Sequence, residues 1–189
     1  MRRKAWLSIA AWLAWSMTGL SAAVSAHAQS GVAVSVQQME EAVARRFPKR
    51  YPVAGLLELT LQAPRLRLLP ELNRLATEMD IVAAGAALAR STTGTFDVDF
   101  ALRYEARDQT IRAHQFHINA LRLSGLPPGP AALLDAYAPV LARQILVELV
   151  LHQLSPQDLA LSDGLGLEPG AITVTARGLV ISFVAKSVR

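Results

Sequence analysis

The stretch from Thr95 to Glu105 reads TFDVDFALRYE, and its apolar and polar residues alternate. In an extended chain, successive side chains point to opposite faces. One face then carries Phe96, Val98, Phe100, Leu102 and Tyr104, and the other carries Thr95, Asp97, Asp99, Ala101, Arg103 and Glu105. This alternation predicts a strand of an antiparallel sheet with one buried face and one solvated face.

The neighbouring segments extend this strand into a sheet. A turn at 106–109 leads to a second predicted strand over 110–123. Upstream, leucines alternate with polar residues over 57–68, where Pro64 marks a bulge or an edge strand because proline donates no backbone hydrogen bond. The Ala-rich segment 75–90 is compatible with a helix, but Gly85 and the adjacent strands favour a strand. Because the connections are short, we expect an antiparallel meander.

A long helix is predicted over 131–154, after the Pro- and Gly-rich breaker at 126–130. Its second half is apolar around nearly the whole circumference, and such a helix is either buried on most sides or lies in a membrane. The charged residues within it argue against a membrane span, and Pro139 predicts a kink or a restart. We therefore expect the sheet to curve strongly around this helix.

The remaining elements are shorter. A helix is predicted over 36–46, because Ser35 and Gln38 form a capping box ahead of an apolar stripe. A Gly- and Asp-rich loop should follow Ser155 and Pro156, before two strand segments at 171–176 and 179–184. The predicted fold class is α+β: a strongly curved antiparallel sheet, made of the meander plus the C-terminal strands, wrapped around the long helix, with a short N-terminal helix.

The composition limits the kind of protein. The 189 residues include no cysteine, 18% charged residues and 52% hydrophobic residues, with a formal net charge of +4. These values fit one globular domain and argue against a disordered or collagen-like chain. The lack of cysteine excludes thiolate zinc sites, Fe–S clusters, a cysteine nucleophile and a lipid anchor on an N-terminal lipobox cysteine.

The first 28 residues have the layout of a secretory signal peptide. Arg2, Arg3 and Lys4 precede an uncharged stretch, and Ala26-His27-Ala28 forms an A-x-A cleavage site before Gln29. The alternative is a retained membrane anchor, since the stretch is nearly long enough to span a bilayer. We expect cleavage, which leaves residues 29–189 as one domain.

Cleavage changes the charge balance of the exported protein. Without Arg2, Arg3 and Lys4, the 19 basic residues become 16 against 15 acidic ones, a net charge of +1. A nearly neutral protein is a poor binder of polyanions, so a nucleic-acid partner is not expected. All three tryptophans, at positions 6, 12 and 15, also leave with the signal peptide.

Several local sequences together resemble the DUF1439 family, whose best-known members are the YceB-like periplasmic lipoproteins. They are the helix after Ser35, Phe47-Pro48, Ala63-Pro64-Arg65-Leu66-Arg67-Leu68, Leu102-Arg103-Tyr104 and Pro169-Gly170-Ala171-Ile172-Thr173-Val174. The resemblance covers roughly residues 32–183 and implies a bent antiparallel sheet cradling a C-terminal helix, similar to half of a tubular lipid-binding (TULIP, SMP-like) module. The chain lacks the lipobox cysteine of those lipoproteins, so we expect a soluble periplasmic form without their membrane tether.

Two groups of residues are candidates for binding. An apolar cleft between helix and sheet is expected to be lined by the apolar face of the 95–105 strand and the facing side of the long helix: Phe96, Val98, Phe100, Leu102, Leu134, Tyr137, Leu141 and Ile145. The alternative is that these residues are simply core. The basic run Arg45, Arg46, Lys49 and Arg50 either complements a helix C-terminus or contacts anionic headgroups or a partner protein.

Other polar residues have ordinary interpretations. On a regular strand, His114 and His117 point to opposite faces and do not share a metal ion unless a bulge intervenes. Asp97 and Asp99 share a face, where two carboxylates can bind a cation or act as an acid/base pair, but solvated surface charges are the favoured interpretation. Glu148 and His152, four residues apart on the predicted helix, are expected to be a rim pair or to hold the polar end of a ligand.

The sequence contains no nucleophile elbow, P-loop or dinucleotide fingerprint. We therefore expect a non-enzymatic periplasmic domain that binds a lipid or another hydrophobic ligand, without a metal or cofactor. The alternative is an envelope interaction or structural domain with a filled core. A periplasmic hydrolase is the third hypothesis, and a clustered base, nucleophile and orienting group would revive it.

Overall fold

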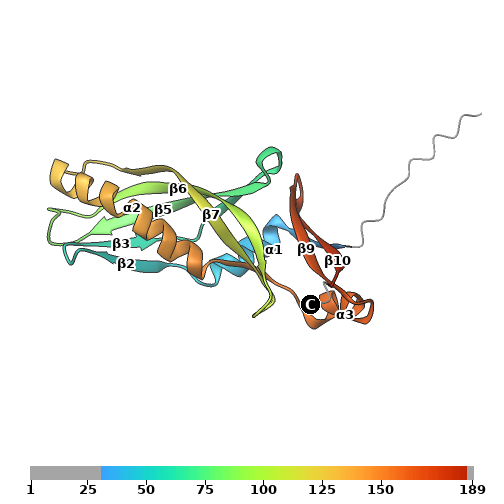
Figure 1. Ribbon diagram of the computed structural model, residues 1–189. Coiled ribbons are helices and arrows are strands. Elements are labelled where there is room, and N and C mark those ends of the chain that lie inside the picture. Colours follow the sequence, from blue (N-terminus) through green and yellow to red (C-terminus); the bar gives the residue numbers. More distant parts are fainter. Residues whose placement is uncertain (1–30, 187–189) are drawn as a thin grey trace, which may run out of the picture.

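The computed structural model describes residues 31–186 and shows an α+β fold built on a strongly curled antiparallel sheet (Figure 1). The predicted signal peptide lies outside the described residues. The helices are α1 (Val36–Ala44), α2 (Pro128–Glu148) and α3 (Pro156–Gly164), with a 3-10 turn η1 (Pro70–Leu72). The strands are β1 (Gly31–Ser35), β2 (Lys49–Val53), β3 (Leu57–Leu61), β4 (Arg65–Leu69), β5 (Arg74–Ala84), β6 (Thr92–Glu105), β7 (Thr110–Leu123), β8 (Val150–Gln153), β9 (Leu167–Thr175) and β10 (Gly178–Ala185).

The large sheet has the predicted meander at its centre. Its strand order is β2-β3-β5-β6-β7-β8, and β4 also pairs with β5. β3 and β4 pair with the two ends of β5, so they behave as one strand interrupted at Pro64, as the sequence predicts. The 75–90 segment is a strand up to Ala84, where Gly85 begins a turn with a φ of 141°.

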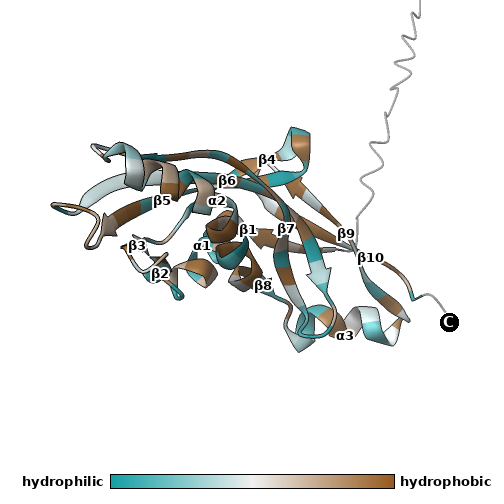
Figure 2. Cartoon of the chain, turned by 60° about the vertical axis from the view of Figure 1, so that its left-hand side comes forward, coloured by the Kyte–Doolittle hydropathy of each residue, from teal (hydrophilic) through white to brown (hydrophobic). Residues whose placement is uncertain are grey.

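The alternating face of β6 is buried as predicted. Phe96 and Phe100 are 0% exposed and Val98 is 1% exposed, whereas Leu102 and Tyr104 are half-buried. The polar face points outward, where opposite charges on different strands pair: Arg65 on β4 lies 3.1 Å from Glu78 on β5, and Arg67 on β4 lies 3.1 Å from Asp97 on β6. The colouring of Figure 2 alternates along β7 between hydrophobic and hydrophilic positions. One side of the sheet is therefore the core side.

The capping box predicted for the first helix is present. The Ser35 hydroxyl accepts from the Gln38 backbone at 3.2 Å, and the Gln38 amide oxygen accepts from the Ser35 backbone at 2.9 Å. Met39 and Val43, four residues apart on one helix face, are fully buried. The helix packs against β8 and β4.

The long helix α2 crosses the face of the sheet and contacts β7 and β2 (Figure 1). Prolines at its start are tolerated because the first turn of a helix needs no backbone donors. Leu134, Leu141 and Ile145 are at most 3% exposed, whereas Val140 and Val147 on the outer side are 46% and 66% exposed.

The prediction that this helix continues to residue 154 is wrong. α2 ends at Glu148, and Val150–Gln153 forms β8, which pairs with the first residues of β7. The backbone of Leu154 also donates to Gln109 at 2.9 Å. The unbroken apolar run at 149–151 is explained by this change, because a short strand buried on both faces is apolar at successive positions.

The C-terminal strands do not join the large sheet, contrary to the prediction. β10 lies between β1 and β9 in a separate three-stranded sheet. β10 pairs with β1, the first strand in the sequence, and not with a strand of the meander. The segment predicted as a loop after Ser155 also contains α3, whose own capping box joins Ser155 to Asp158.

Asn73 connects the two sheets. It adopts a left-handed conformation with a φ of 51° after η1. Its side-chain amide donates to the Ile172 carbonyl at 3.0 Å and accepts from the Val174 backbone at 2.7 Å. The Asn73 side chain therefore provides hydrogen-bond partners for both the Ile172 carbonyl and the Val174 N–H of β9.

We expect Asn73→Ala to destabilise the fold by about 2–3 kcal/mol, from two lost hydrogen bonds and a left-handed backbone that alanine disfavours. Asn73→Gly should cost about 1 kcal/mol less, because glycine adopts this conformation freely. Urea unfolding of the three proteins measures both differences. An Asn73→Ala variant as stable as the parent would exclude this role.

Within residues 31–186, none of the helices is long and apolar enough to cross a bilayer.

Candidate functional site

The eight predicted lining residues are brought together, mostly as core. Six of them are at most 3% exposed and belong to one continuous hydrophobic cluster: Phe96, Val98, Phe100, Leu134, Leu141 and Ile145. Leu102 and Tyr137 are half-buried against the same cluster. The centre of the helix–sheet contact is therefore closely packed.

The apolar interior reaches solvent along the seam, by which we mean the contact between α2 and β7. Several hydrophobic side chains of these two elements and of the turn between them are only partly buried: Phe116, Ile118, Leu121, Leu123, Leu126, Leu133 and Tyr137. Two bulges in β7 produce this arrangement, since the register with β6 shifts after Asp97 and after Asp99. An extra residue at a bulge resets the alternation, so Ile118 and Leu121 face Val98 and Phe96 on the same side.

A pocket opens at the end of the seam where β7 finishes and α2 begins. It has a volume of about 340 Å³, within the range of about 300–1,000 Å³ that is usual for ligand sites. Its lining comprises Leu121, Arg122, Leu123, Gly125, Leu126, Ala131, Leu134 and Asp135. We call it the seam pocket. Of the eight predicted residues, Leu134 lines it directly, and Tyr137 follows one helical turn later on α2.

The four predicted basic residues do not form one surface. Arg45 is the C-cap of α1, and Lys49 and Arg50 are successive residues of β2. Successive strand residues point to opposite faces, so Lys49 and Arg50 are separated by the sheet. Arg50 also lies 3.9 Å from Glu58 on the neighbouring strand.

Asp99 is not the solvated charge that the sequence predicts. Its side chain is 13% exposed and forms an ion pair with Arg74, whose guanidinium also donates to the carbonyls of Asp99 and Gln115. Asp97 instead binds Arg67 and accepts from Asn119 at 3.1 Å. The two carboxylates therefore serve different arginines. Arg74 fixes the β7 bulge at Gln115, where φ is 49°.

The β7 bulge at Gln115 places His114 and His117 on the same face of the sheet, not on the opposite faces expected for a regular strand. His114 pairs with Ala101 and His117 with Asp99, residues two apart on β6, so both histidines lie on the outer face. His114 makes a 3.1 Å hydrogen bond to the Leu102 carbonyl. Among the described residues, no three His, Asp or Glu side chains gather in a way that would hold a metal ion.

His152 belongs to β8 and not to the helix that ends at Glu148, so the helical spacing predicted for these two residues is wrong. Its Nε2 atom is buried and has no hydrogen-bond partner. Burial lowers the pKa of His152 below the ordinary histidine value, and the charge of Asp158 opposes this shift. The folded protein therefore favours the neutral imidazole.

This lowered pKa predicts acid sensitivity. A histidine held neutral by folding contributes its full stability above its unfolded pKa, about 6.5, and loses it as the pH falls below that value. We expect the free energy of unfolding to decrease from pH 7.5 to pH 5, and His152→Gln to decrease less than the parent. His117→Gln, on the exposed outer face, is the control. Equal pH dependence in the parent and His152→Gln would contradict the prediction.

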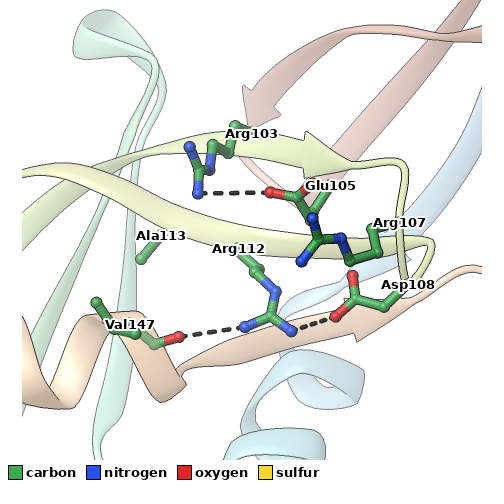
Figure 3. Close-up of a pocket in the computed structure, with 7 residues that line it drawn as sticks. All are labelled: Arg103, Glu105, Arg107, Asp108, Arg112, Ala113 and Val147. Atoms are coloured by element: carbon green, nitrogen blue, oxygen red, sulfur yellow. Dashed lines mark hydrogen bonds and ion pairs between the residues drawn. The ribbon is translucent and has the colours of Figure 1, made fainter.

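A polar hollow lies at the other end of α2, where the sequence predicts no site (Figure 3). It has a volume of about 420 Å³, and we call it the arginine basin. The hairpin of β6 and β7 supplies most of the lining, and the last turn of α2 completes it: Arg103, Glu105, Arg107, Asp108, Arg112, Ala113 and Val147. The sequence did contain a signal, because the four-residue turn at 106–109 places Arg103 opposite Arg112.

In comparisons with known proteins, the chain matches neither a protein-family model nor a curated protein.

Proposed function

We propose that this protein is an exported, periplasmic, non-enzymatic carrier of a lipid or another hydrophobic ligand, of the DUF1439 type, and that the ligand's apolar part enters the seam. The observation that carries the proposal is the row of partly buried hydrophobic side chains between α2 and β7, ending in the seam pocket. Apolar surface left open beside a closed core commonly marks a binding site.

The lining of the seam pocket is part apolar and part charged, which suits an amphiphile. Leu121, Leu123, Leu126 and Leu134 offer aliphatic contacts, and Arg122 and Asp135 at the same pocket are exposed. Binding of an alkyl chain would remove the exposed parts of Leu121, Leu123 and Leu126 from water, a gain of about 25 cal/mol per Å² of apolar area.

A tryptophan reporter tests this proposal. The described residues contain no tryptophan, so Tyr137→Trp places a single indole in the seam of the exported protein. We expect a fatty acid brominated on its chain to quench this fluorescence saturably. Tyr104→Trp makes the same exchange about 25 Å along β6 from the seam pocket, so the bromine atoms should quench it much less.

Equal quenching of the two reporters, or none of either, would count against ligand entry at the seam.

The packed centre of the helix–sheet contact favours a second candidate, an envelope interaction domain that works through its surface. The exposed Val140 and Val147 on the outer side of α2 agree with this candidate. Val140→Asp combined with Val147→Asp should then abolish capture of a periplasmic partner and leave the Tyr137→Trp quenching unchanged.

A further inference from the structure

The register of β6 and β7 places two positive charges directly opposite each other. Arg103 pairs with Arg112 on the same face of the hairpin. Like charges in directly opposite positions of an antiparallel pair destabilise it. Elsewhere on the sheet the chain does the reverse, since Arg65 stands opposite Glu78. The arrangement at Arg103 and Arg112 therefore needs a compensating negative charge.

The protein's own carboxylates compensate only partly. Asp108 pairs with Arg112, but Glu105 lies 3.5 Å from Arg103 in a pair exposed to water. Arg107 adds a third guanidinium and forms no ion pair within the described residues. Figure 3 shows its side chain directed back from the turn toward Arg112. The basin thus holds three arginines against two carboxylates.

Arg112 is held firmly in place. It donates to the Thr110 hydroxyl at 2.9 Å and to the Val147 carbonyl at 3.2 Å, in addition to Asp108. Hydrogen bonds from Thr110 and Arg112 keep the pKa of Asp108 below its ordinary value, so this carboxylate remains charged at neutral pH. The three donors of the basin therefore differ: Arg112 is fixed, whereas Arg103 and Arg107 are available to a ligand.

We propose that the arginine basin binds a phosphate-type oxyanion, with the guanidinium groups of Arg103 and Arg107 donating to its oxygens and Arg112 supplying the fixed positive charge. Arginine suits this task because its planar group donates two parallel hydrogen bonds to phosphate. The hollow of about 420 Å³ is large enough for a phosphate ester. The oxyanion is either free phosphate or the phosphate of a lipid headgroup. The inference does not depend on ligand binding in the seam.

The test is a titration of the exported protein with inorganic phosphate, in which sodium chloride keeps the ionic strength constant. The side-chain Nε–H signals of the arginines report binding in proton–nitrogen NMR spectra. We expect saturable shifts for Arg103 and Arg107. Arg103→Gln and Arg107→Gln should each weaken binding about tenfold, since each removes charge-assisted hydrogen bonds. Arg177→Gln, an exposed turn residue with the same charge change, should bind like the parent.

Non-saturable shifts, or equal affinities in all three variants, would overturn the proposal. Unchanged urea unfolding of the variants separates lost binding from lost folding. A second arm uses monomeric dihexanoyl phosphatidic acid, with dihexanoylglycerol, which has the same chains and no phosphate, as the counterpart that should cause no arginine shifts. Saturable shifts of the same arginines with the phosphatidic acid assign a lipid headgroup, and shifts with inorganic phosphate alone assign a soluble anion. Quenching in Tyr137→Trp is measured separately, so failure at the basin and failure at the seam are distinguishable.

Discussion

Leu141→Ala should destabilise the protein by about 3–4 kcal/mol, because the leucine is 0% exposed in the contact between α2 and the sheet. Truncation of a buried leucine removes transfer free energy and leaves a cavity that the surrounding core fills only partly. Urea unfolding measures the change as a lower midpoint with an unchanged slope.

The adjacent residue provides a matched control. Val140 is 46% exposed on the outer side of the same helix, so Val140→Ala should change the stability by less than about 1 kcal/mol. Similar losses in the two variants would mean that α2 does not sit on the sheet as described.

Asp99→Ala should lower the free energy of unfolding by about 2–4 kcal/mol. It leaves the Arg74 guanidinium, 21% exposed, without its carboxylate. Removal of one partner from a buried ion pair leaves an uncompensated charge away from water. It also releases the Arg74 side chain that holds the bulge at Gln115. The partial exposure of both groups places the cost toward the lower end of this range.

Two further variants identify the cause of the loss. Arg74→Leu combined with Asp99→Leu should recover much of the stability, because apolar replacement of both partners leaves no unpaired charge. Arg67→Met, at an ion pair whose arginine is 55% exposed, should cost less than about 1 kcal/mol. A double variant as unstable as Asp99→Ala would show that the loss does not come from the unpaired arginine.

The local sequence pattern correctly predicted the structural features that depend on residues close together in the sequence. The alternation of 95–105, the interruption at Pro64 and the capping box at Ser35 each act within a few residues, and the structure contains all three. The curled antiparallel sheet follows from the same short connections.

The errors come from long-range pairing. β1 and β10 are joined across nearly the whole chain, and no local signal distinguishes that pairing from a continued meander. The 149–151 run is apolar enough for either a helix or a strand, and only pairing with β7 decides between them. α3 was predictable, since Ser155-Pro156 followed by Asp158 is a helix-start pattern.

The candidate site also has a part that the sequence predicted and a part that it did not. The sequence identified which residues of β6 and α2 are apolar and facing, but close packing made most of them core. The open part of the contact depends on two bulges in β7. Its signal was the change of phase between Phe116-x-Ile118 and Leu121-x-Leu123, which a regular strand does not explain.

The most direct measurement of the proposed function is the content of the protein as purified from the periplasm. Solvent extraction and mass spectrometry of the parent should yield an amphiphile in near-stoichiometric amount. Ala131→Trp fills the seam pocket and should remove it, whereas Ala132→Trp, at the exposed neighbouring residue, should retain it. An empty parent protein, or equal amounts in the two variants, would contradict ligand binding at the seam.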